Sequence, residues 1–333
     1  MAHIAIIGST TWGTTLAIIN SEEGKHVSLL VRTKEESDLL RKHRENKRFL
    51  PGITFPDTLE VTSKPQDLIP ETDLLVIAVP SQSLRKNIGA ISSYVSASTI
   101  IVSASKGLES TSGMRMTEII KEEIPDLSPD NICALSGPNL SNEILAGKPS
   151  SSVICSINLT TAKSAQSILK CSHLRLYTNT DVIGVEICGA LKNITAIAAG
   201  ICDGLNLGDN AKASIITRGL AEMARFGSAI GAEPSTFSGL AGMGDLIATC
   251  SSSLSRNNQV GRMLAKDMPL NQIIKSMDNV AEGIETTKAV VSVANRLNID
   301  LPIAQAVYNI LFKNLSVRDA REELMGRTLT SET

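Results

Sequence analysis

Short apolar runs alternate with helical patterns along the first half of the chain. The apolar runs cover residues 3–7, 26–31, 73–79, 99–103 and 131–135, and turn residues follow each of them. Runs of this length are typical of strands buried on both faces of a parallel sheet. Two further runs, residues 151–156 and 174–177, predict edge strands. Strands that alternate with helices predict a doubly wound α/β domain, whose ligands bind at the carboxyl ends of the strands.

Beyond about residue 180 the apolar residues recur at three- and four-residue steps, as on one face of a helix. These steps predict helices over residues 181–205, 211–231, 282–297, 303–312 and 317–325. The first is long and rich in alanine, with Asp181 as N-cap and Gly204 as stop. We therefore predict an α/β domain with a doubly wound sheet over residues 1–180. An all-α C-terminal domain, residues 181–333, would follow it.

Lys192 interrupts the apolar helix predicted over residues 181–205, where it stands between Leu191 and Ile194. Burying an ammonium group is unfavourable unless the group has a partner or a lowered pKa. Lys192 is therefore the first candidate for proton chemistry. The alternative is a lysine whose charged end reaches solvent from a half-exposed helix, which is the commoner behaviour of an isolated lysine.

Composition narrows the class of protein. A length of 333 residues with 42% hydrophobic residues is ordinary for a globular protein of two domains. The net charge of −2 and the 3% of aromatic residues give no sign of a nucleic-acid surface. The six cysteines lack ligand-like spacing and are typical of core residues in a reducing compartment. Glu186 and Lys192 argue against a membrane span over residues 181–205. We expect a cytoplasmic protein with a small-molecule ligand and no nucleic-acid, membrane or metal partner.

The turn after the first predicted strand has the outline of a dinucleotide fingerprint. In G-x-G-x-x-G the second glycine lets the backbone approach the pyrophosphate. Here the three positions hold Gly8, Thr10 and Gly13, so that glycine is missing. A helix that begins there still offers free N–H groups to an anion. By itself the motif is equally compatible with a nucleotide loop and with an ordinary strand-to-helix turn.

Arg32 ends the second predicted strand, where an acidic residue would bind the ribose 2′-hydroxyl of NAD. A cation at that place tolerates or prefers the 2′-phosphate of NADP. The alternative is a solvated charge at the start of a charged helix. The sequence leaves both interpretations of Arg32 open.

Further motifs, in a fixed order, extend these observations to nearly the whole chain. They read GSTTWGT, NKRFLPG, SKGL, SGPNLSNE, GVEICGALKNITAIAAGICDGL, GDNAKASIITRGLAEM, GLAGMGDLIATCSSSLSRN and VAEG. From Ile4 to about Pro302 the chain resembles the bacterial-type NAD(P)-dependent glycerol-3-phosphate dehydrogenases. The resemblance implies NAD or NADP as cofactor and reversible reduction of dihydroxyacetone phosphate to sn-glycerol 3-phosphate. It also implies that residues 1–180 form a Rossmann-like, dinucleotide-binding domain and that residues 181–333 form a helical substrate-binding and catalytic domain. A supply of glycerophospholipid precursor and a homodimer are implied as well.

Matched position by position, the resemblance implies that Lys192 is the catalytic general acid/base. A lysine with a lowered pKa can deliver a proton to the ketone oxygen near neutral pH. The implied substrate-binding residues are Lys106, Gly137, Asn139, Lys192, Asp245, Ser255, Arg256 and Asn257. The implied cofactor-binding residues are Gly8, Thr10, Thr11, Trp12, Gly13, Arg32, Phe49, Lys106, Ser141, Arg256, Val280 and Glu282.

Several of these residues have other interpretations. Asp245 could bind a substrate hydroxyl or hold Lys192, but it could also be only a helix N-cap. Thr10, Asn139, Ser141 and Phe49 depart from the family pattern, which leaves open a nucleotide-binding regulator or pseudoenzyme on the same fold. A different two-domain reductase, of the 3-hydroxyacyl-CoA or 6-phosphogluconate type, is a third possibility.

Overall fold

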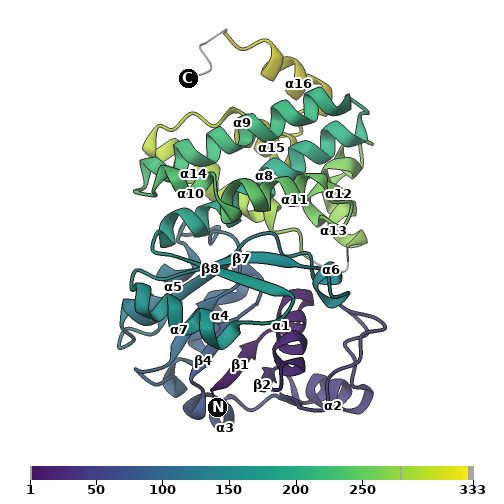
Figure 1. The fold of residues 1–333 in the computed structure, drawn as a ribbon. Coiled ribbons are helices and arrows are strands. Elements are labelled where there is room, and N and C mark those ends of the chain that lie inside the picture. Colours follow the sequence, from purple (N-terminus) through teal and green to yellow (C-terminus); the bar gives the residue numbers. More distant parts are fainter. Residues whose placement is uncertain (1, 278–279, 329–333) are drawn as a thin grey trace.

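The computed structural model describes residues 2–277 and 280–328. An α/β domain, drawn in purple to teal at the bottom of Figure 1, carries a helical domain, drawn in green to yellow. The last strand ends at Asn179 and the next helix begins at Val182. The predicted fold class, a Rossmann-like sheet domain followed by helices, is confirmed. The division into a dinucleotide-binding domain of residues 1–180 and a helical substrate-binding and catalytic domain of residues 181–333 stays a prediction.

One eight-stranded sheet forms the centre of the first domain, in the order β3-β2-β1-β4-β5-β6-β7-β8. The strands are β1 His3–Ile7, β2 His26–Leu30, β3 Leu59–Thr62, β4 Leu74–Ile77, β5 Ile100–Ser103, β6 Ile132–Ser136, β7 Ser150–Cys155 and β8 Leu174–Asn179. The pattern did not predict β3, an edge strand in which only Val61 is buried. Neighbouring strands are parallel except β6 and β7.

The antiparallel pair corrects the prediction of a parallel sheet, and β7, predicted as an edge strand, lies between β6 and β8. The chain between β6 and β7 contains only one short helix, α6 Ser141–Leu145. Ser150 Oγ donates a hydrogen bond to Pro138 O at 2.8 Å, so β7 starts beside the point where β6 ends. The chain therefore turns back at the same edge of the sheet instead of crossing to its other end.

Helices cover both faces of the sheet. Both faces of β1 are buried, which explains why its whole length is apolar. Ile4 and Ile6 pack in the cluster on one face of the sheet, and Ala5 and Ile7 pack in the cluster on the other face. The first cluster lies under α1 Thr11–Glu22, α2 Lys34–His43, α6 and α7 Leu159–Leu169. The second lies under α3 Pro65–Leu68, α4 Leu84–Gly89 and α5 Met116–Glu123. Short 3₁₀ turns cover Ile69–Glu71 (η1), Ser81–Ser83 (η2), Ser92–Tyr94 (η3) and Pro129–Asn131 (η4).

The helix α8, Val182–Gly204, runs through the middle of the second domain. Asp181 caps it, accepting a hydrogen bond from Gly184 N at 2.8 Å, as predicted. Around it pack α9 Gly208–Ala229, α10 Pro234–Phe237, the π-helical turn η5 Leu240–Gly244, α11 Asp245–Ser251, α12 Arg256–Leu264, α13 Leu270–Ser276, α14 Glu282–Leu297, α15 Pro302–Phe312 and α16 Val317–Met325. By length and composition α8 could cross a membrane, but 94% of its most apolar window is buried inside the protein.

Small residues bring α12 against α8. A Cβ atom on Gly200 would lie 2.1 Å from Asn258 O, and one on Gly261 would lie 2.0 Å from Ile197 O. Neither glycine can be replaced without moving a backbone. The close approach matters because α12 carries the Ser255-Arg256-Asn257 segment at its start.

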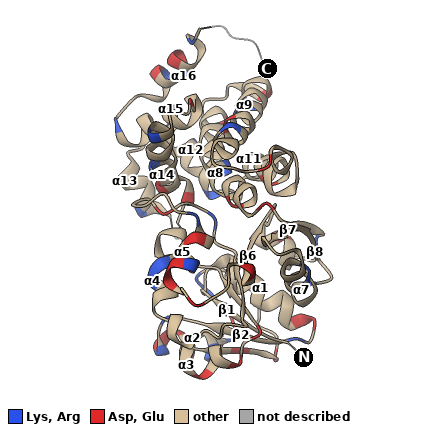
Figure 2. Cartoon of the chain, turned by 90° about the vertical axis from the view of Figure 1, so that its left-hand side faces the viewer, with Lys and Arg blue, Asp and Glu red and all other residues tan. Residues whose placement is uncertain are grey.

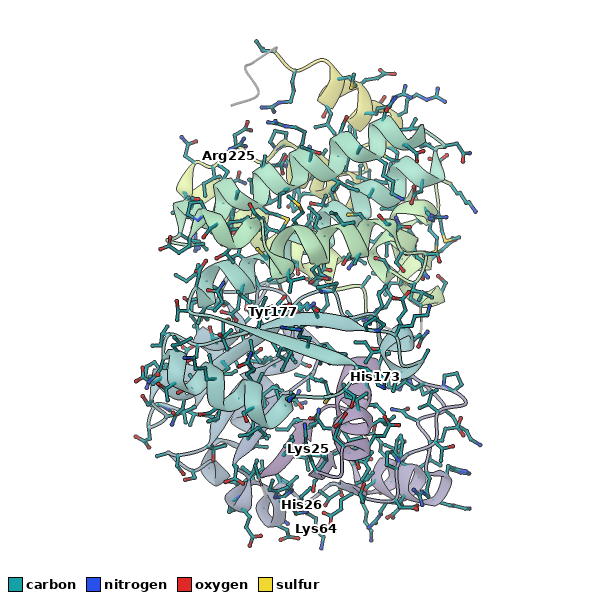
Figure 3. All side chains as sticks on the ribbon, viewed as in Figure 1. Lys25, His26, Lys64, His173, Tyr177 and Arg225 are labelled. Carbon is teal, nitrogen blue, oxygen red and sulfur yellow. The ribbon has the colours of Figure 1, made fainter. Side chains whose placement is uncertain are left out.

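The carboxyl ends of the six mutually parallel strands, β1 to β6, point toward the helical domain. The N-terminus and His26, at the amino ends of β1 and β2, lie at the opposite end of the molecule (Figures 1 and 3). Lysine, arginine and acidic residues are dispersed along both domains (Figure 2). The edge at which a doubly wound sheet binds its ligands therefore lies at the junction of the two domains.

Candidate active site

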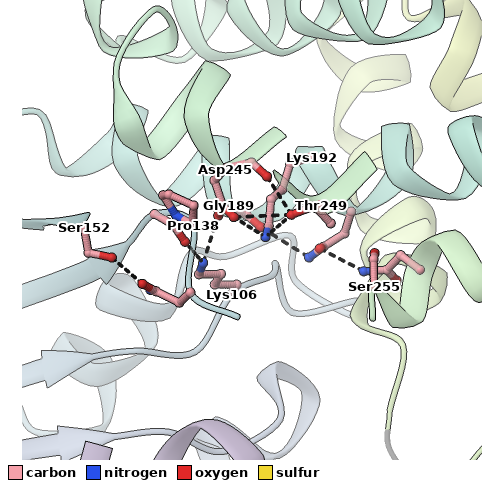
Figure 4. Close-up of polar contacts among 12 residues, drawn as sticks. Lys106, Pro138, Ser152, Gly189, Lys192, Asp245, Thr249 and Ser255 are labelled. Atoms are coloured by element: carbon pink, nitrogen blue, oxygen red, sulfur yellow. Dashed lines mark hydrogen bonds and ion pairs between the residues drawn. The ribbon is translucent and has the colours of Figure 1, made fainter. Parts of the chain in front are cut away.

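Two lysines from different domains meet at one carboxylate. Lys106 follows β5 in the sheet domain, Lys192 lies in α8, and Asp245 is the first residue of α11. Asp245 Oδ2 is 2.8 Å from Lys106 Nζ, and Asp245 Oδ1 is 2.7 Å from Lys192 Nζ. Figure 4 shows the carboxylate between the two ammonium groups. The N-cap of α11 is Gly244, so the capping interpretation of Asp245 is wrong.

Lys192 does not reach solvent, which excludes the half-exposed interpretation. The residue is 7% exposed, and its Nζ also donates a hydrogen bond to Thr249 Oγ1 at 2.8 Å. Burial lowers the pKa of Lys192 to about 8, because it outweighs the opposing effect of the Asp245 carboxylate. Burial raises the pKa of Asp245, but Lys106 and Lys192 together hold it below its usual value. The arrangement therefore combines a proton donor that titrates near neutral pH with a carboxylate that stays ionised.

Thr249 was not among the predicted site residues. It lies one helical turn after Asp245, so the two side chains share a face of α11. That spacing is the only signal the sequence gave, and it has no meaning until Asp245 is known to face Lys192.

Glycines allow Lys106 to cross between the domains. A Cβ atom on Gly189 of α8 would lie 3.4 Å from Lys106 Cγ and 2.7 Å from Ser136 Oγ. Lys106 Nζ also donates a hydrogen bond to Gly137 O at 2.8 Å. Gly137 has a φ of +148°, and a Cβ atom there would lie 2.7 Å from Ser152 Oγ, so only glycine fits.

Two polar groups beside this cluster have no hydrogen-bond partner among the described residues. They are Ser136 Oγ and Asn139 Nδ2, both fully shielded from solvent. The other end of the Asn139 amide, Oδ1, accepts a hydrogen bond from Ser152 Oγ at 2.5 Å. Unpaired buried donors are rare in native proteins and are consistent with a ligand at this place.

The Ser255-Arg256-Asn257 segment forms the start of α12. Ser255 is its N-cap, with Oγ accepting a hydrogen bond from Asn258 N at 3.3 Å. Arg256 is exposed, and its Nη1 donates to Val280 O at 3.0 Å. Asn257 is buried. Its Nδ2 donates to Asn193 Oδ1 at 2.9 Å, and its Oδ1 accepts from Gly283 N at 3.0 Å. Asn257 thus ties α12 to α8 and α14.

The fingerprint turn is tightly packed although its second glycine is missing. A Cβ atom on Gly8 would lie 2.5 Å from Ala78 O, and one on Gly13 would lie 2.0 Å from Gly8 O. Thr10 is the N-cap residue of α1 in an extended conformation, and its Oγ1 donates to Ala78 O at 2.9 Å instead of capping the helix. The first N–H groups of α1 therefore have no capping side chain, as an anion site requires. Trp12 Nε1 is buried without a partner among the described residues.

The other predicted cofactor residues lie on both sides of the domain junction. On the sheet side, Thr11 begins α1, Arg32 follows β2 and is exposed, and Ser141 begins α6. Phe49 is half-buried, with Arg48 Cζ 5.0 Å from its ring centroid.

On the helical side, Glu282 begins α14 and Val280 precedes it. The carboxylate of Glu282 accepts hydrogen bonds from Ser81 N, at 3.1 Å, and from Ser81 Oγ. This contact joins the turn after β4 to the helical domain. The sequence gave no sign that Ser81 is the partner of Glu282.

Metal chemistry receives no support from the described part of the chain. No three His, Cys, Asp or Glu side chains in residues 2–277 and 280–328 are placed to hold one metal ion. The six cysteines are buried free thiols.

Comparison with known proteins identifies the family. A family model described as NAD-dependent glycerol-3-phosphate dehydrogenase N-terminus matches residues 3–162, and the model of the C-terminus matches residues 181–322. The chain belongs to this family. A glycerol-3-phosphate dehydrogenase (NAD(P)+) of Dehalococcoides mccartyi is 46% identical over 333 residues, which are 100% of this chain and 93% of that relative. That of Chlorobium luteolum is 45% identical over 98% of each chain.

A solved structure agrees with the sequence matches. Glycerol-3-phosphate dehydrogenase from Coxiella burnetii superimposes with a TM-score of 0.93 at 34% identity, over 98% of this chain and 99% of that one. The family predicted from the motifs is confirmed, and membership excludes the other two-domain reductases that the sequence left open. The roles of single residues in a glycerol-3-phosphate dehydrogenase site stay predictions.

Proposed function

We propose that the chain catalyses the reversible, NAD(P)-dependent reduction of dihydroxyacetone phosphate to sn-glycerol 3-phosphate. Family membership supports the reaction. The observation that carries it is the Asp245 carboxylate shared by Lys106 and Lys192. This cluster lies at the carboxyl ends of the parallel strands, where such sheets bind their ligands. The N-terminus of α1, which has no capping side chain, is the proposed site of the cofactor pyrophosphate.

Lys192 is the general acid of the reduction and the general base of the reverse reaction. Its pKa of about 8 leaves it protonated at neutral pH yet able to release the proton. Asp245 and Thr249 fix the direction of its Nζ. Lys106 adds a second positive charge that polarises the ketone oxygen. The nicotinamide, when bound, supplies or accepts the hydride.

Arg256 is the main ligand of the substrate phosphate in this proposal. Its guanidinium can form paired hydrogen bonds with phosphate oxygens, and the start of α12 contributes its positive dipole end. Ser255 and Asn257 act largely by fixing that helix start, since their side chains are already bonded to protein groups.

The cellular setting follows from chemistry. The product of the proposed reaction, sn-glycerol 3-phosphate, is the backbone of glycerophospholipids, so the enzyme supplies their synthesis. Free buried thiols suit a reducing cytoplasm. A homodimer without membrane or nucleic-acid contact is inferred from the family and from apolar side chains exposed on the helical domain, among them Met243, Ile247 and Ile274.

Two measurements test the proposal. Purified protein should oxidise NADH or NADPH when dihydroxyacetone phosphate is added. Lys192→Ala should lose kcat by about 10²–10⁴-fold, the usual contribution of general acid catalysis, with an unchanged Kd for the cofactor. Lys275→Ala, at an exposed position of α13, is the matched control and should keep full activity.

Two outcomes would contradict the proposal in different ways. If Lys192→Ala kept more than about a tenth of kcat, Lys192 would not be the proton donor. If the wild-type protein bound NADH but reduced no ketone, the regulator or pseudoenzyme interpretation would replace the enzyme.

A further inference from the structure

One carboxylate joins the fingerprint turn to the end of β2. Gly8 N donates a hydrogen bond to Leu30 O at 3.2 Å, so the turn and the strand end lie side by side. Beside this contact, one oxygen of the Glu36 carboxylate accepts a hydrogen bond from Ser9 Oγ. The other oxygen accepts from Arg32 N at 3.4 Å. Glu36 is therefore fixed against the loop that would bind the cofactor.

Helix capping does not account for this position. Thr33 is the N-cap of α2, and its Oγ1 accepts from Glu36 N at 3.2 Å. In a capping box the side chain three residues after the N-cap returns to the N–H of the N-cap itself. The Glu36 carboxylate reaches past Thr33 to Arg32 N and across to Ser9. Its contacts thus point to the fingerprint turn rather than to the helix.

The chemistry of a carboxylate suits a ribose at this place. An ionised carboxylate only accepts hydrogen bonds, and its two oxygens offer about four acceptor positions. Ser9 and Arg32 N use two of them. In dinucleotide-binding sheets an acidic residue near the end of the second strand accepts a hydrogen bond from the ribose 2′-hydroxyl. The strand end itself has Arg32, but Glu36 brings a carboxylate to the same edge from the first turn of α2.

The competing cation is held less firmly. Arg32 is exposed, and its side chain makes no hydrogen bond or ion pair with the residues that the structure describes. An exposed charge is screened by water and salt, whereas a carboxylate fixed by two hydrogen bonds keeps its place. Glu36 should therefore affect the relative affinity for a 2′-hydroxyl and a 2′-phosphate more strongly than Arg32 does.

We propose that Glu36 determines the cofactor specificity of this chain. Held by Ser9, it accepts a hydrogen bond from the adenosine ribose and repels a 2′-phosphate, so the protein binds NADH more tightly than NADPH. Arg32 lets NADPH remain a weaker cofactor. The inference rests on the proposed function, because it assigns one part of the same cofactor site.

Binding measured without substrate tests the inference. We would titrate NADH and NADPH separately into the wild-type protein, Glu36→Gln and Glu35→Gln, and obtain Kd from calorimetry. Glu36→Gln should weaken NADH and strengthen NADPH, so that the ratio of the two Kd values shifts by about tenfold, a typical effect for a hydrogen bond to a charged group. Glu35→Gln is the matched control, since Glu35 is exposed in the same first turn. It should leave the ratio unchanged.

Two further probes separate specificity from a structural role. Adenosine 5′-monophosphate and its 2′-phosphorylated form carry the ribose but no nicotinamide, and the same shift should appear in their Kd ratio. Ser9→Ala should shift the ratio in the same direction by a smaller factor, because it removes one of the two bonds that hold Glu36.

Three results would overturn the inference. Glu36→Gln could weaken both dinucleotides equally, it could lower Tm without changing the ratio, or the wild-type protein could bind NADPH as tightly as NADH. Each would make Glu36 a structural residue or a minor one. A wild-type protein that binds neither dinucleotide would instead refute the proposed function.

Discussion

The pKa of Lys192, which the shared carboxylate of Asp245 helps to set, predicts opposite pH profiles for the two directions of the reaction. As the proposed general acid/base, Lys192 must be protonated to reduce the ketone and deprotonated to oxidise the alcohol. Its pKa is lowered to about 8 by burial, against the opposing charge of Asp245. As pH rises through that value, kcat/KM for dihydroxyacetone phosphate should fall, whereas kcat/KM for sn-glycerol 3-phosphate should rise.

Replacing Asp245 by Asn should move both inflections to lower pH. Asp245 Oδ1 lies 2.7 Å from Lys192 Nζ, and an opposite charge this close changes a pKa by about 1–3 units. Without the carboxylate, burial and Lys106 remain as the main influences on the pKa of Lys192, and both lower it. We therefore expect the inflection of Asp245→Asn at roughly pH 5–7. The assay is the absorbance of the reduced cofactor, followed in both directions across this pH range.

A half-buried carboxylate of α8, that of Asp203, provides the control. Asp203 pairs with Lys212 Nζ at 2.9 Å and with Arg262 Nη2 at 3.0 Å, away from the lysine pair. Asp203→Asn should lower Tm and leave the inflection in place. The reasoning is refuted if Asp245→Asn keeps the wild-type inflection, or if both reaction directions respond to pH with the same sign.

Two substitutions test the phosphate site and the fingerprint turn. Arg256→Lys keeps a charge but loses the paired hydrogen bonds of a guanidinium, so KM for dihydroxyacetone phosphate should rise with little change in KM for the cofactor; the opposite pattern would place Arg256 on the cofactor. Thr10→Gly removes a methyl group from the expected path of the pyrophosphate and should lower the Kd of NADH. The gain is limited because the bond from Thr10 Oγ1 to Ala78 O is lost and a glycine loop costs about 0.5–1 kcal/mol to order. A higher Kd in an intact fold would contradict the steric role given to Thr10.

The sequence predicted those elements whose burial is uniform. The strand β1 and the helix α8 are apolar along nearly their whole length because both are surrounded by protein. The strand β3 was missed because an edge strand buries only one face, which leaves a single buried residue, Val61. The reversed direction of β7 was missed for another reason. Direction depends on how the chain turns after β6, and the apolar pattern of a strand is the same in either direction.

The sequence draws attention to a residue that conflicts with its surroundings, and it gives no sign of a residue whose candidate role depends on a distant partner. Lys192 is conspicuous as a charge in an apolar helix. Glu36 is an ordinary acidic residue in a charged helix until Ser9 is placed beside it. Thr249 and Ser81 likewise gain meaning only from contacts with Lys192 and Glu282. Hydroxyl groups bond to whatever the fold places near them, so spacing along the chain does not reveal their partners.

The charges at the domain junction explain why a phosphorylated ketone suits this site. Lys192 and Asp245 form a pair within the helical domain, and Lys106 from the sheet domain adds an ammonium group, which leaves one positive charge on the cluster. Arg256 brings a further positive charge at the start of α12. A phosphate monoester carries a charge of about −1.5 to −2 near neutral pH. This charge offsets the positive charge of the lysine cluster and that of Arg256. The substrate phosphate would thus complete an electrostatic arrangement that requires both domains. In the proposed function, the contact of Lys106 with Asp245 would therefore be a condition of catalysis and not only of packing.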